Sequence, residues 1–251
     1  MIEQHTDFEV RIATTPEDIQ GAQALRYAVF VKELGADGPM VNHSAQLEID
    51  AFDQHAEQLI LLDHTRDEGD KIVGVYRLMD RNAAERAGRF YTENEYDLGV
   101  LKATNRSMLE LGRSCVHPDY RGGVALLHLW KALAKEVDTR GIEILFGVAS
   151  FHGTDLDTLA PALSLLARDH MAPRPLRVRS QSYQPMDLVD QIDRIATMKQ
   201  VPSLIKAYLR LGGVVGDGAF VDHAFNTTDV CLILDTSAMN ARQRAIYGGR
   251  K

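Results

Sequence analysis

The chain has 251 residues and a formal net charge of −7, with 45% hydrophobic and 25% charged residues. This composition is typical of a soluble globular protein, and the acidic balance argues against nucleic acid as a main partner. The two cysteines lie in apolar runs and no metal-ligand spacing occurs, so we expect neither a disulfide nor a metal site. The start, MIEQHTDFEV, lacks the apolar region of a signal peptide, and no apolar run is long enough to span a membrane. We therefore expect a cytoplasmic protein.

The first third of the chain predicts a strand, a helix and a hairpin. Residues 8–13 alternate as a strand does, and a helix should begin after Thr15, with proline at its first position, and end at Gly35. Arg26 lies in the apolar stripe of that helix, either snorkelling to solvent or serving a buried role. Residues 58–63 and 71–78 should pair as an antiparallel hairpin. The charged segment 82–95 is expected to be a mobile surface segment.

Residues 108–123, MLELGRSCVHPDYRGG, predict a buried strand, a turn with glycines and a helix. Two charges, Glu110 and Arg113, lie in the apolar run, and a buried charge is costly unless it is paired or used. In a regular strand these two side chains face opposite sides, so we predict a bulge at Gly112 that brings them to one face. The alternative is a structural ion pair between them. The helix should bury a stripe formed by Val124, Leu127, Trp130 and Leu133.

The rest of the chain predicts a second buried strand, two helices and a last strand. Residues 142–150 are apolar on both faces, as in a strand covered on both sides. Helices are expected from the turn at 151–155 to about residue 170 and at 202–211, followed by a strand at 229–234. The basic tail after Asn240 should be frayed. Residues 167–180 carry four arginines, which form either a solvated loop or a docking patch for an acidic partner.

The order of these elements resembles that of the GNAT N-acyltransferase fold. The resemblance implies an α/β, GNAT-like acyltransferase fold with a mixed central sheet flanked by helices. It also implies a single domain over residues 1–251, extended by an inserted segment at about 151–213. The chain departs from the GNAT pyrophosphate signature, because Arg121 is followed at once by Gly122 and Gly123. A donor that carries a single phosphate on a phosphopantetheine arm is compatible with this smaller turn.

Longer runs resemble the bacterial ornithine N-acyltransferases of ornithine-lipid synthesis. The runs are ALRYAVF (24–30), FDQHAEQLILLD (52–63), ELGRSCVHPDYRGG (110–123), FGVASFHGTD (146–155) and PSLIKAYLRLGGVVGDGAFVDHAFNTTDVCLIL (202–234). That family moves a fatty acyl group, typically 3-hydroxylated, from acyl carrier protein to the α-amine of ornithine, giving lyso-ornithine lipid. The resemblance implies no tightly bound cofactor, and peripheral contact with the inner face of the membrane through the lipid product.

A more distant resemblance to acyl-homoserine-lactone synthases keeps other functions open. The chain lacks the tryptophan that those synthases carry after the first helix. Another N-acyl amino acid synthase, a lactone synthase using S-adenosylmethionine, and a non-catalytic acyl-carrier-binding protein remain alternatives. The positions that match the synthase pattern are Arg26, Phe30, Asp50, Asp53, Arg77, Glu110 and Arg113.

The chemistry of the implied reaction assigns roles to these residues. Glu110 is the expected base for the α-ammonium and acts with Arg113, while amides near Cys115 and Val116 should stabilise the oxyanion. Cys115 is expected to pack in the core rather than attack the thioester. The carboxylate of ornithine suits Arg26, Arg77 or Arg113, and its side-chain ammonium suits Asp50, Asp53 or Asp222. Ser114 and Cys115 complete the expected substrate pocket. Phosphopantetheine and acyl carrier protein should meet Arg121, Gly122, Gly123, Arg174, Arg177 and Arg179.

Overall fold

The computed structural model describes residues 6–122 and 124–247. Its strands are β1 (Phe8–Ile12), β2 (Val41–Asn42), β3 (Leu47–Glu48), β4 (Glu57–Asp63), β5 (Ile72–Asp80), β6 (Tyr96–Asp97), β7 (Met108–Val116), β8 (Ile144–His152), β9 (Arg179–Ser180), β10 (Val214–Val215), β11 (Phe220–Asp222) and β12 (Thr227–Asp235). Its α-helices are α1 (Pro16–Arg26), α2 (Arg81–Ala87), α3 (Gly99–Lys102), α4 (Ala125–Arg140), α5 (Leu156–Asp169), α6 (Arg194–Gln200), α7 (Ser203–Arg210) and α8 (Ala241–Tyr247).

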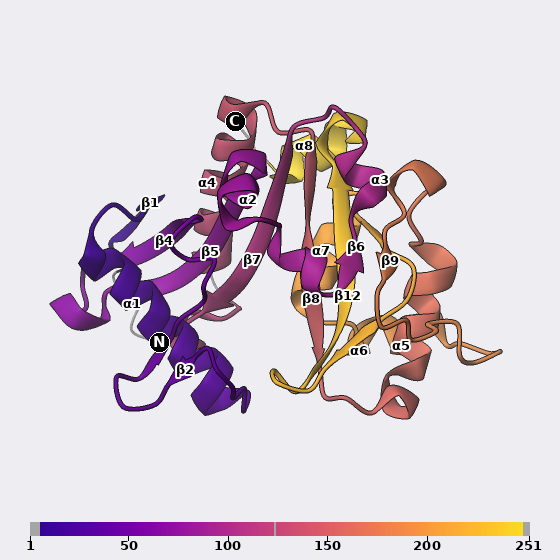
Figure 1. Cartoon of the computed structure of the whole chain (residues 1–251), viewed down its shortest axis with the longest axis horizontal. Helices are drawn as coiled ribbons and strands as arrows, with labels where there is room; N and C mark the ends of the chain where they lie inside the picture. Colours follow the sequence, from indigo (N-terminus) through magenta and orange to yellow (C-terminus); the bar gives the residue numbers. More distant parts are fainter. Residues whose placement is uncertain (1–5, 123, 248–251) are drawn as a thin grey trace.

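One mixed sheet organises the molecule, with strands in the order β1-β4-β5-β7-β8-β12-β10 and with β11 also paired to β12. The expected hairpin is confirmed, since β4 and β5 are antiparallel. The two central strands, β7 and β8, are parallel, and they pair only from Met108–Glu110 to Ile144–Phe146. Beyond that point the two strands diverge (Figure 1). The sheet therefore opens into a V at its centre.

Glycine is required where the V opens. A Cβ atom on Gly147 would lie 2.1 Å from the backbone oxygen of Leu111, so only a residue without a side chain permits this approach. On the other edge of β7, the register with β5 shifts between Val75 and Arg77, and two residues of β7 oppose one of β5. Arg113 lies in this bulge with φ of +47°. The predicted bulge is confirmed, one residue after Gly112.

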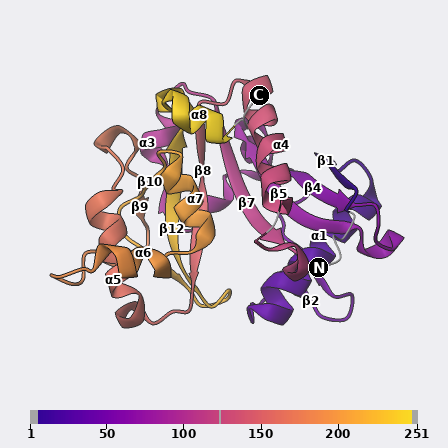
Figure 2. The same ribbon diagram turned by 180° about the vertical axis from the view of Figure 1, so that it is seen from behind.

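Helices cover both faces of the sheet. In Figure 1, α1, α2 and α3 lie in front of it, and Figure 2 shows α4 and α7 on the opposite face. The first helix is capped as predicted: Thr15 accepts from the backbone N–H of Asp18. The chain continues beyond α1 as a π-helix, Tyr27–Glu33 (η1), and turns at Gly35 with φ of +77°. The largest apolar cluster lies between the sheet and α4, α5 and α7.

The expectation of a mobile surface segment at 82–95 is wrong. This segment forms α2 and a 3₁₀ turn, Tyr91–Asn94 (η3), and it buries Ala83, Phe90 and Thr92 against the sheet. The sequence of this segment does not indicate its burial, because the buried positions are small alanines and scattered aromatic residues among charged ones and form no regular apolar stripe.

Two further expectations at helices are wrong. Val124 and Leu127 are 55% and 46% exposed, since α4 turns Ala125, Leu129 and Leu133 toward the sheet instead. The tail after Asn240 is not frayed up to residue 247: it forms α8, in which the side chains of Asn240 and Gln243 accept from each other's backbone N–H. Gly123 and residues 248–251, the end of that tail, lie outside the described residues.

Candidate active site

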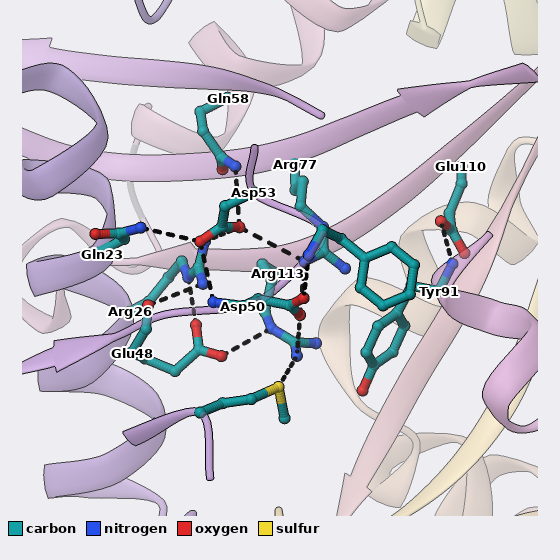
Figure 3. A network of polar contacts seen from close by, with 12 residues as sticks. Gln23, Arg26, Glu48, Asp50, Asp53, Gln58, Arg77, Tyr91, Glu110 and Arg113 are labelled. Atoms are coloured by element: carbon teal, nitrogen blue, oxygen red, sulfur yellow. Dashed lines mark hydrogen bonds and ion pairs between the residues drawn. The ribbon is translucent and has the colours of Figure 1, made fainter. Parts of the chain in front are cut away.

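A buried network of arginines and carboxylates lies beside β7 (Figure 3). Arg26, at the end of α1, is fully buried, so it does not snorkel to solvent. It donates to the carboxylate of Glu48 and, at 2.8 Å, to Asp53, and its Nη2 donates to the backbone oxygen of Glu48 at 2.9 Å. Glu48 lies at the end of β3, Asp53 lies in the loop that follows, and Gln58 on β4 adds a weak contact to Asp53 at 3.4 Å.

Two more arginines close the network from the sheet. Arg113 donates to Asp50 at 2.7 Å and to Glu48 at 3.1 Å. Nη1 of Arg77 lies 2.7 Å from Asp50, although neither terminal nitrogen of Arg77 has an aligned hydrogen-bond acceptor among the described residues. Three arginines thus face three acids in a space closed to solvent. No ion pair joins Glu110 to Arg113 within the described part of the chain.

Electrostatics keep this network charged. Burial raises the pKa of Asp50 and Asp53, but the neighbouring guanidinium groups outweigh burial and hold both pKa values below the usual range. Burial likewise lowers the pKa of Arg26, and the facing carboxylates of Glu48 and Asp53 more than compensate, so the net shift is upward. Asp50 and Asp53, two of the three acids that were expected to bind a substrate ammonium, are therefore already paired with arginines of the protein itself.

Aromatic rings fix the arginine that reaches the cavity. The guanidinium of Arg113 lies 4.4 Å from the ring centroid of Tyr91 and 4.8 Å from that of Phe225. Tyr91 also contacts Arg77, at 5.1 Å. Phe30, on η1, packs edge-on against Phe225 at 6.2 Å. These rings hold Arg113 at the border between the network and the open V of the sheet.

A cavity of about 260 Å³ occupies the V between β7 and β8. Its lining changes across the sheet, since strand residues alternate between faces. On the α4 and α7 side the lining is apolar and includes Tyr76, Leu145, Ala149, Leu204, Tyr208 and Leu232. On the opposite side it is polar and includes Thr92, Glu110, Arg113, Ser150, Asp222 and Asp229. The cavity therefore suits a molecule with a long apolar part and a charged head.

Glu110 lies on the polar side, held by a turn that the sequence did not reveal. One of its carboxylate oxygens accepts from the backbone N–H of Thr92 at 2.6 Å. The other accepts from that of Tyr91 at 3.0 Å (Figure 3). Burial raises its pKa, and the bonds from Thr92 together with the charge of Arg77 limit that rise. A raised pKa makes this carboxylate a stronger proton acceptor than an exposed glutamate.

Three further carboxylates gather where β11 and β12 meet the polar side. One oxygen each of Glu95, Asp222 and Asp229 lies within 4.8 Å of the others. Burial, with Asp222 and Asp229 nearby, raises the pKa of Glu95 well above its usual range, and burial raises that of Asp229 to about 6. Of these three acids, only Asp222 was predicted from the sequence to bind substrate. Asp229, a carboxylate in the apolar run DVCLIL, carried the same signal as Glu110 and could have been found.

Several other predicted site residues lie away from the cavity or at its edge. Ser114 lines it, whereas Cys115 packs against α1, where burial raises its thiol pKa to about 12. Cys115 and Val116 pair in register with β5 rather than lining the cavity, so the expected oxyanion donors are better sought at residues 112–114, which do line it. Arg121 pairs with Glu33 at the surface, beside Gly122 with φ of +73°.

The arginine-rich segment lies at the surface, and its charges are partly satisfied locally. Arg168 binds Asp187, and Nη1 of Arg179 lies 2.9 Å from Asp217. Arg177 donates to the backbone oxygen of Ala172 at 2.7 Å. Arg174 begins an exposed 3₁₀ turn, Arg174–Leu176. A positive face remains available there, although weaker than four free arginines would make it.

Within the described residues no helix is both long and apolar enough to cross a membrane.

Comparison with known families and structures identifies the fold of the chain. A family model described as an acetyltransferase (GNAT) domain matches residues 25–131. The solved AHL synthase LasI is similar over 98% of this chain and 96% of its own, with a TM-score of 0.53 and 15% identity. The CoA-dependent acyl-homoserine lactone synthase BjaI is similar over 97% and 89%, with a TM-score of 0.54 and 16% identity. These likenesses establish a GNAT-like α/β fold.

Curated relatives are much more similar in sequence. The L-ornithine N(alpha)-acyltransferase of Rhodobacter capsulatus is 53% identical over 247 residues, covering 97% of this chain and 95% of the relative. The protein of the same name from Brucella abortus is 40% identical, covering 96% and 88%. Matches of this identity and extent mean that the chain belongs to the L-ornithine N(alpha)-acyltransferase family.

Proposed function

We propose that the protein transfers a fatty acyl group, typically 3-hydroxylated, from the phosphopantetheine thioester of acyl carrier protein to the α-amine of L-ornithine. The product is lyso-ornithine lipid, and the reaction is the first step of ornithine-lipid synthesis. The observation that carries the proposal is the cavity in the V of the sheet, apolar on one side and lined by carboxylates on the other. The names of its relatives support the acceptor. On this proposal the enzyme works in the cytoplasm, near the inner face of the membrane that receives its lipid product.

The cavity suggests how the two substrates meet. The acyl chain lies on the apolar side, against β8, β12 and α7, with its thioester at the point where β7 and β8 part. The amino acid lies on the polar side, near Glu110 and Arg113. Arg113, and Arg77 behind it, are the arginines that the proposal assigns to the α-carboxylate, and Phe30 closes the edge of the cavity.

The proposed chemistry follows from the protonation of the acceptor. An α-amine with a pKa of about 8 is mostly protonated at neutral pH, so a base must remove a proton before attack. Glu110 takes it, and the nitrogen then attacks the thioester carbonyl carbon. Backbone N–H groups at 112–114, on the edge of β7 that β8 has left, stabilise the oxyanion. As the tetrahedral intermediate collapses, the C–S bond breaks, the nitrogen gives up a second proton, and the leaving pantetheine sulfur takes that proton and departs as the thiol.

Two surface features of the protein support acyl carrier protein as the donor. The turn at Arg121 and Gly122 lacks the usual pyrophosphate signature, and the exposed face at Arg174, Arg177 and Arg179 suits an acidic carrier protein. A direct test compares kcat/KM for a 3-hydroxyacyl carrier thioester and the matching acyl-CoA, with ornithine as acceptor. We expect the carrier thioester to be preferred by a wide margin. Equal values for the two donors would remove this part of the proposal.

The acceptor is tested with the same donor. Ornithine, lysine, glycine, tyrosine and S-adenosylmethionine are offered separately, and the products are identified by mass. We expect ornithine to react fastest and lysine to follow. A lactone formed from S-adenosylmethionine would instead identify a quorum-signal synthase, and no product with any acceptor would favour a non-catalytic carrier-binding protein.

A further inference from the structure

Glu95, Asp222 and Asp229 gather their carboxyl groups in one place, and none of them forms an ion pair with a cation among the described residues. Asp229 is 3% exposed and Glu95 2% exposed. Neither Oδ1 of Asp229 nor Oε2 of Glu95 has a hydrogen-bond partner among the described residues. A buried polar group without a partner destabilises the fold, and more so when it is charged. These carboxylates therefore lie in an arrangement that the fold alone does not stabilise.

The contrast with the other buried acids of the site is sharp. Glu48, Asp50 and Asp53 each contact an arginine of the protein directly. The cation that acts on Glu95 is Arg113, but its Nε and Nη2 already donate to Glu48 and Asp50. Glu95, Asp222 and Asp229 therefore lack a cation that the substrate could bring, whereas Glu48, Asp50 and Asp53 already have arginines as partners.

The fold holds the three carboxylates in place independently of one another. Tyr96, next to Glu95, donates through its hydroxyl to the backbone oxygens of Asp229 at 3.0 Å and of Gly218 at 2.8 Å, which ties β6 to β12. Asp222 accepts from the backbone N–H groups of Ala224 and Phe225. Asp222 and Asp229 both line the cavity. The group is therefore a preformed subsite that opens into the cavity.

We propose that Glu95, Asp222 and Asp229 bind the side-chain ammonium of the acceptor amino acid and thereby select a basic amino acid. An ammonium group has three N–H donors and no acceptor, so it can give one hydrogen bond to each carboxylate. The inference rests on the proposed function, because it places the far end of the acceptor whose α-amine is acylated. Of the acids predicted from the sequence, Asp222 keeps this role and Asp50 and Asp53 lose it, while Glu95 and Asp229 are added.

The same turn positions both ends of the acceptor. Thr92 donates its backbone N–H to Glu110, and the backbone oxygen of Thr92 accepts from the N–H of Glu95 one turn later. The distance between the proposed base and the ammonium subsite is thus set by a single 3₁₀ turn. We expect the enzyme to discriminate acceptors by the number of methylene groups between their two amines.

The test compares ornithine with norvaline, which has the same carbon chain without the side-chain amine. With the parent enzyme we expect kcat/KM to favour ornithine by at least a hundredfold. In Asp229→Asn and, separately, Glu95→Gln, that ratio should fall at least tenfold, mainly through a higher KM for ornithine, while norvaline is used as well as or better than before. Asp138→Asn, an exposed acid on α4, is the matched control and should leave the ratio unchanged.

Each outcome decides the inference separately from the proposed function. If the parent enzyme does not acylate ornithine, the proposed function fails. If it does, but both variants lose activity on ornithine and norvaline equally, the carboxylates act in the chemistry or the fold and the ammonium subsite is refuted. Binding provides a second measurement: ornithine should raise the Tm of the parent enzyme and not that of Asp229→Asn, and norvaline should raise neither.

A divalent cation is the other ligand that three carboxylates could hold. Parent enzyme treated with a chelator and then assayed with and without Mg²⁺ or Ca²⁺ separates the two. We expect the same ornithine-to-norvaline ratio in each case. A ratio that is lost on chelation and restored by the metal would overturn the direct ammonium contact.

Discussion

Replacing Glu110 by glutamine tests the proposed base with little change in shape. The carboxylate accepts two backbone N–H groups, from Tyr91 and Thr92. A glutamine side chain offers one carbonyl oxygen to these two donors, so one hydrogen bond to a charged acceptor is lost, at about 1.5–3 kcal/mol. The neutral amide also avoids the cost of burying a carboxylate, which offsets part of this loss. We expect Glu110→Gln to fold with a Tm lower by roughly 2–8 °C.

The catalytic effect should be much larger than the effect on stability. Loss of a positioned general base lowers kcat by about 10²–10⁴. The pH profile identifies the cause, since burial raises the pKa of Glu110. The base must be ionised, so kcat of the parent should fall as pH drops through that raised pKa. In Glu110→Gln this acidic limb should disappear.

The assay follows release of the carrier thiol at saturating ornithine between pH 5 and 9. Saturation removes any contribution from acceptor binding, so the profile reports the chemical step. Glu85→Gln, an exposed acid on α2, is the matched control and should keep the parent profile. A Glu110→Gln enzyme that keeps more than a tenth of the parent kcat at pH 7, with the acidic limb intact, would show that another group takes the proton.

Three further variants test other parts of the site. Arg26→Gln breaks a buried ion pair and should lower the free energy of unfolding by about 3–5 kcal/mol, measured by denaturant unfolding; a variant as stable as the parent at pH 7 would contradict the network. Because the pKa values of Asp50 and Asp53 are lowered in the folded state, the stability that these acids add to the parent is complete above pH of about 4 and is lost as pH falls. Ala149→Leu fills the apolar side of the cavity and should shift donor preference to shorter acyl chains; an unchanged chain-length profile would place the acyl group elsewhere. Arg174→Gln with Arg177→Gln should raise KM for acyl carrier protein and weaken its salt dependence, whereas an unchanged KM would locate docking on another face.

Local signals in the sequence predicted the frame of the molecule. Thr15 and Pro16 mark the start of α1, and Gly35 and Gly141 mark the ends of helical segments in left-handed conformations. The charged residues of β7 stood out because they interrupt an apolar run, and both line the cavity. The bulge followed from alternation: only an extra residue brings two side chains three positions apart to one face.

Contacts between side chains that are far apart in the sequence could not be predicted from such local signals. Glu48 lies in a run of acids that reads as a solvated face, and only the folded chain brings it between Arg26 and Arg113. The turn that holds Glu110 belongs to a segment without a regular apolar stripe, because small and aromatic residues share the burial. Glu95 belongs to the same segment, and its burial could not be predicted for the same lack of a regular apolar stripe. Burial of a charge depends on which elements cover it, and this information is not local in the sequence.

The ammonium subsite at one end of the acceptor and Glu110 at the other suggest how one of the two amines of ornithine is chosen for acylation. Ornithine has an α-amine with a pKa of about 8 and a side-chain amine close to the 10.4 of lysine, and only a neutral amine can attack a thioester. An ammonium held by Glu95, Asp222 and Asp229 would remain protonated and therefore unreactive. Arg113 would face the α-carboxylate, and Glu110 alone would be positioned to remove a proton. The selectivity for the α-amine would then follow from electrostatics: one end of the acceptor is kept charged by unpaired acids, and the other is deprotonated by a base of raised pKa.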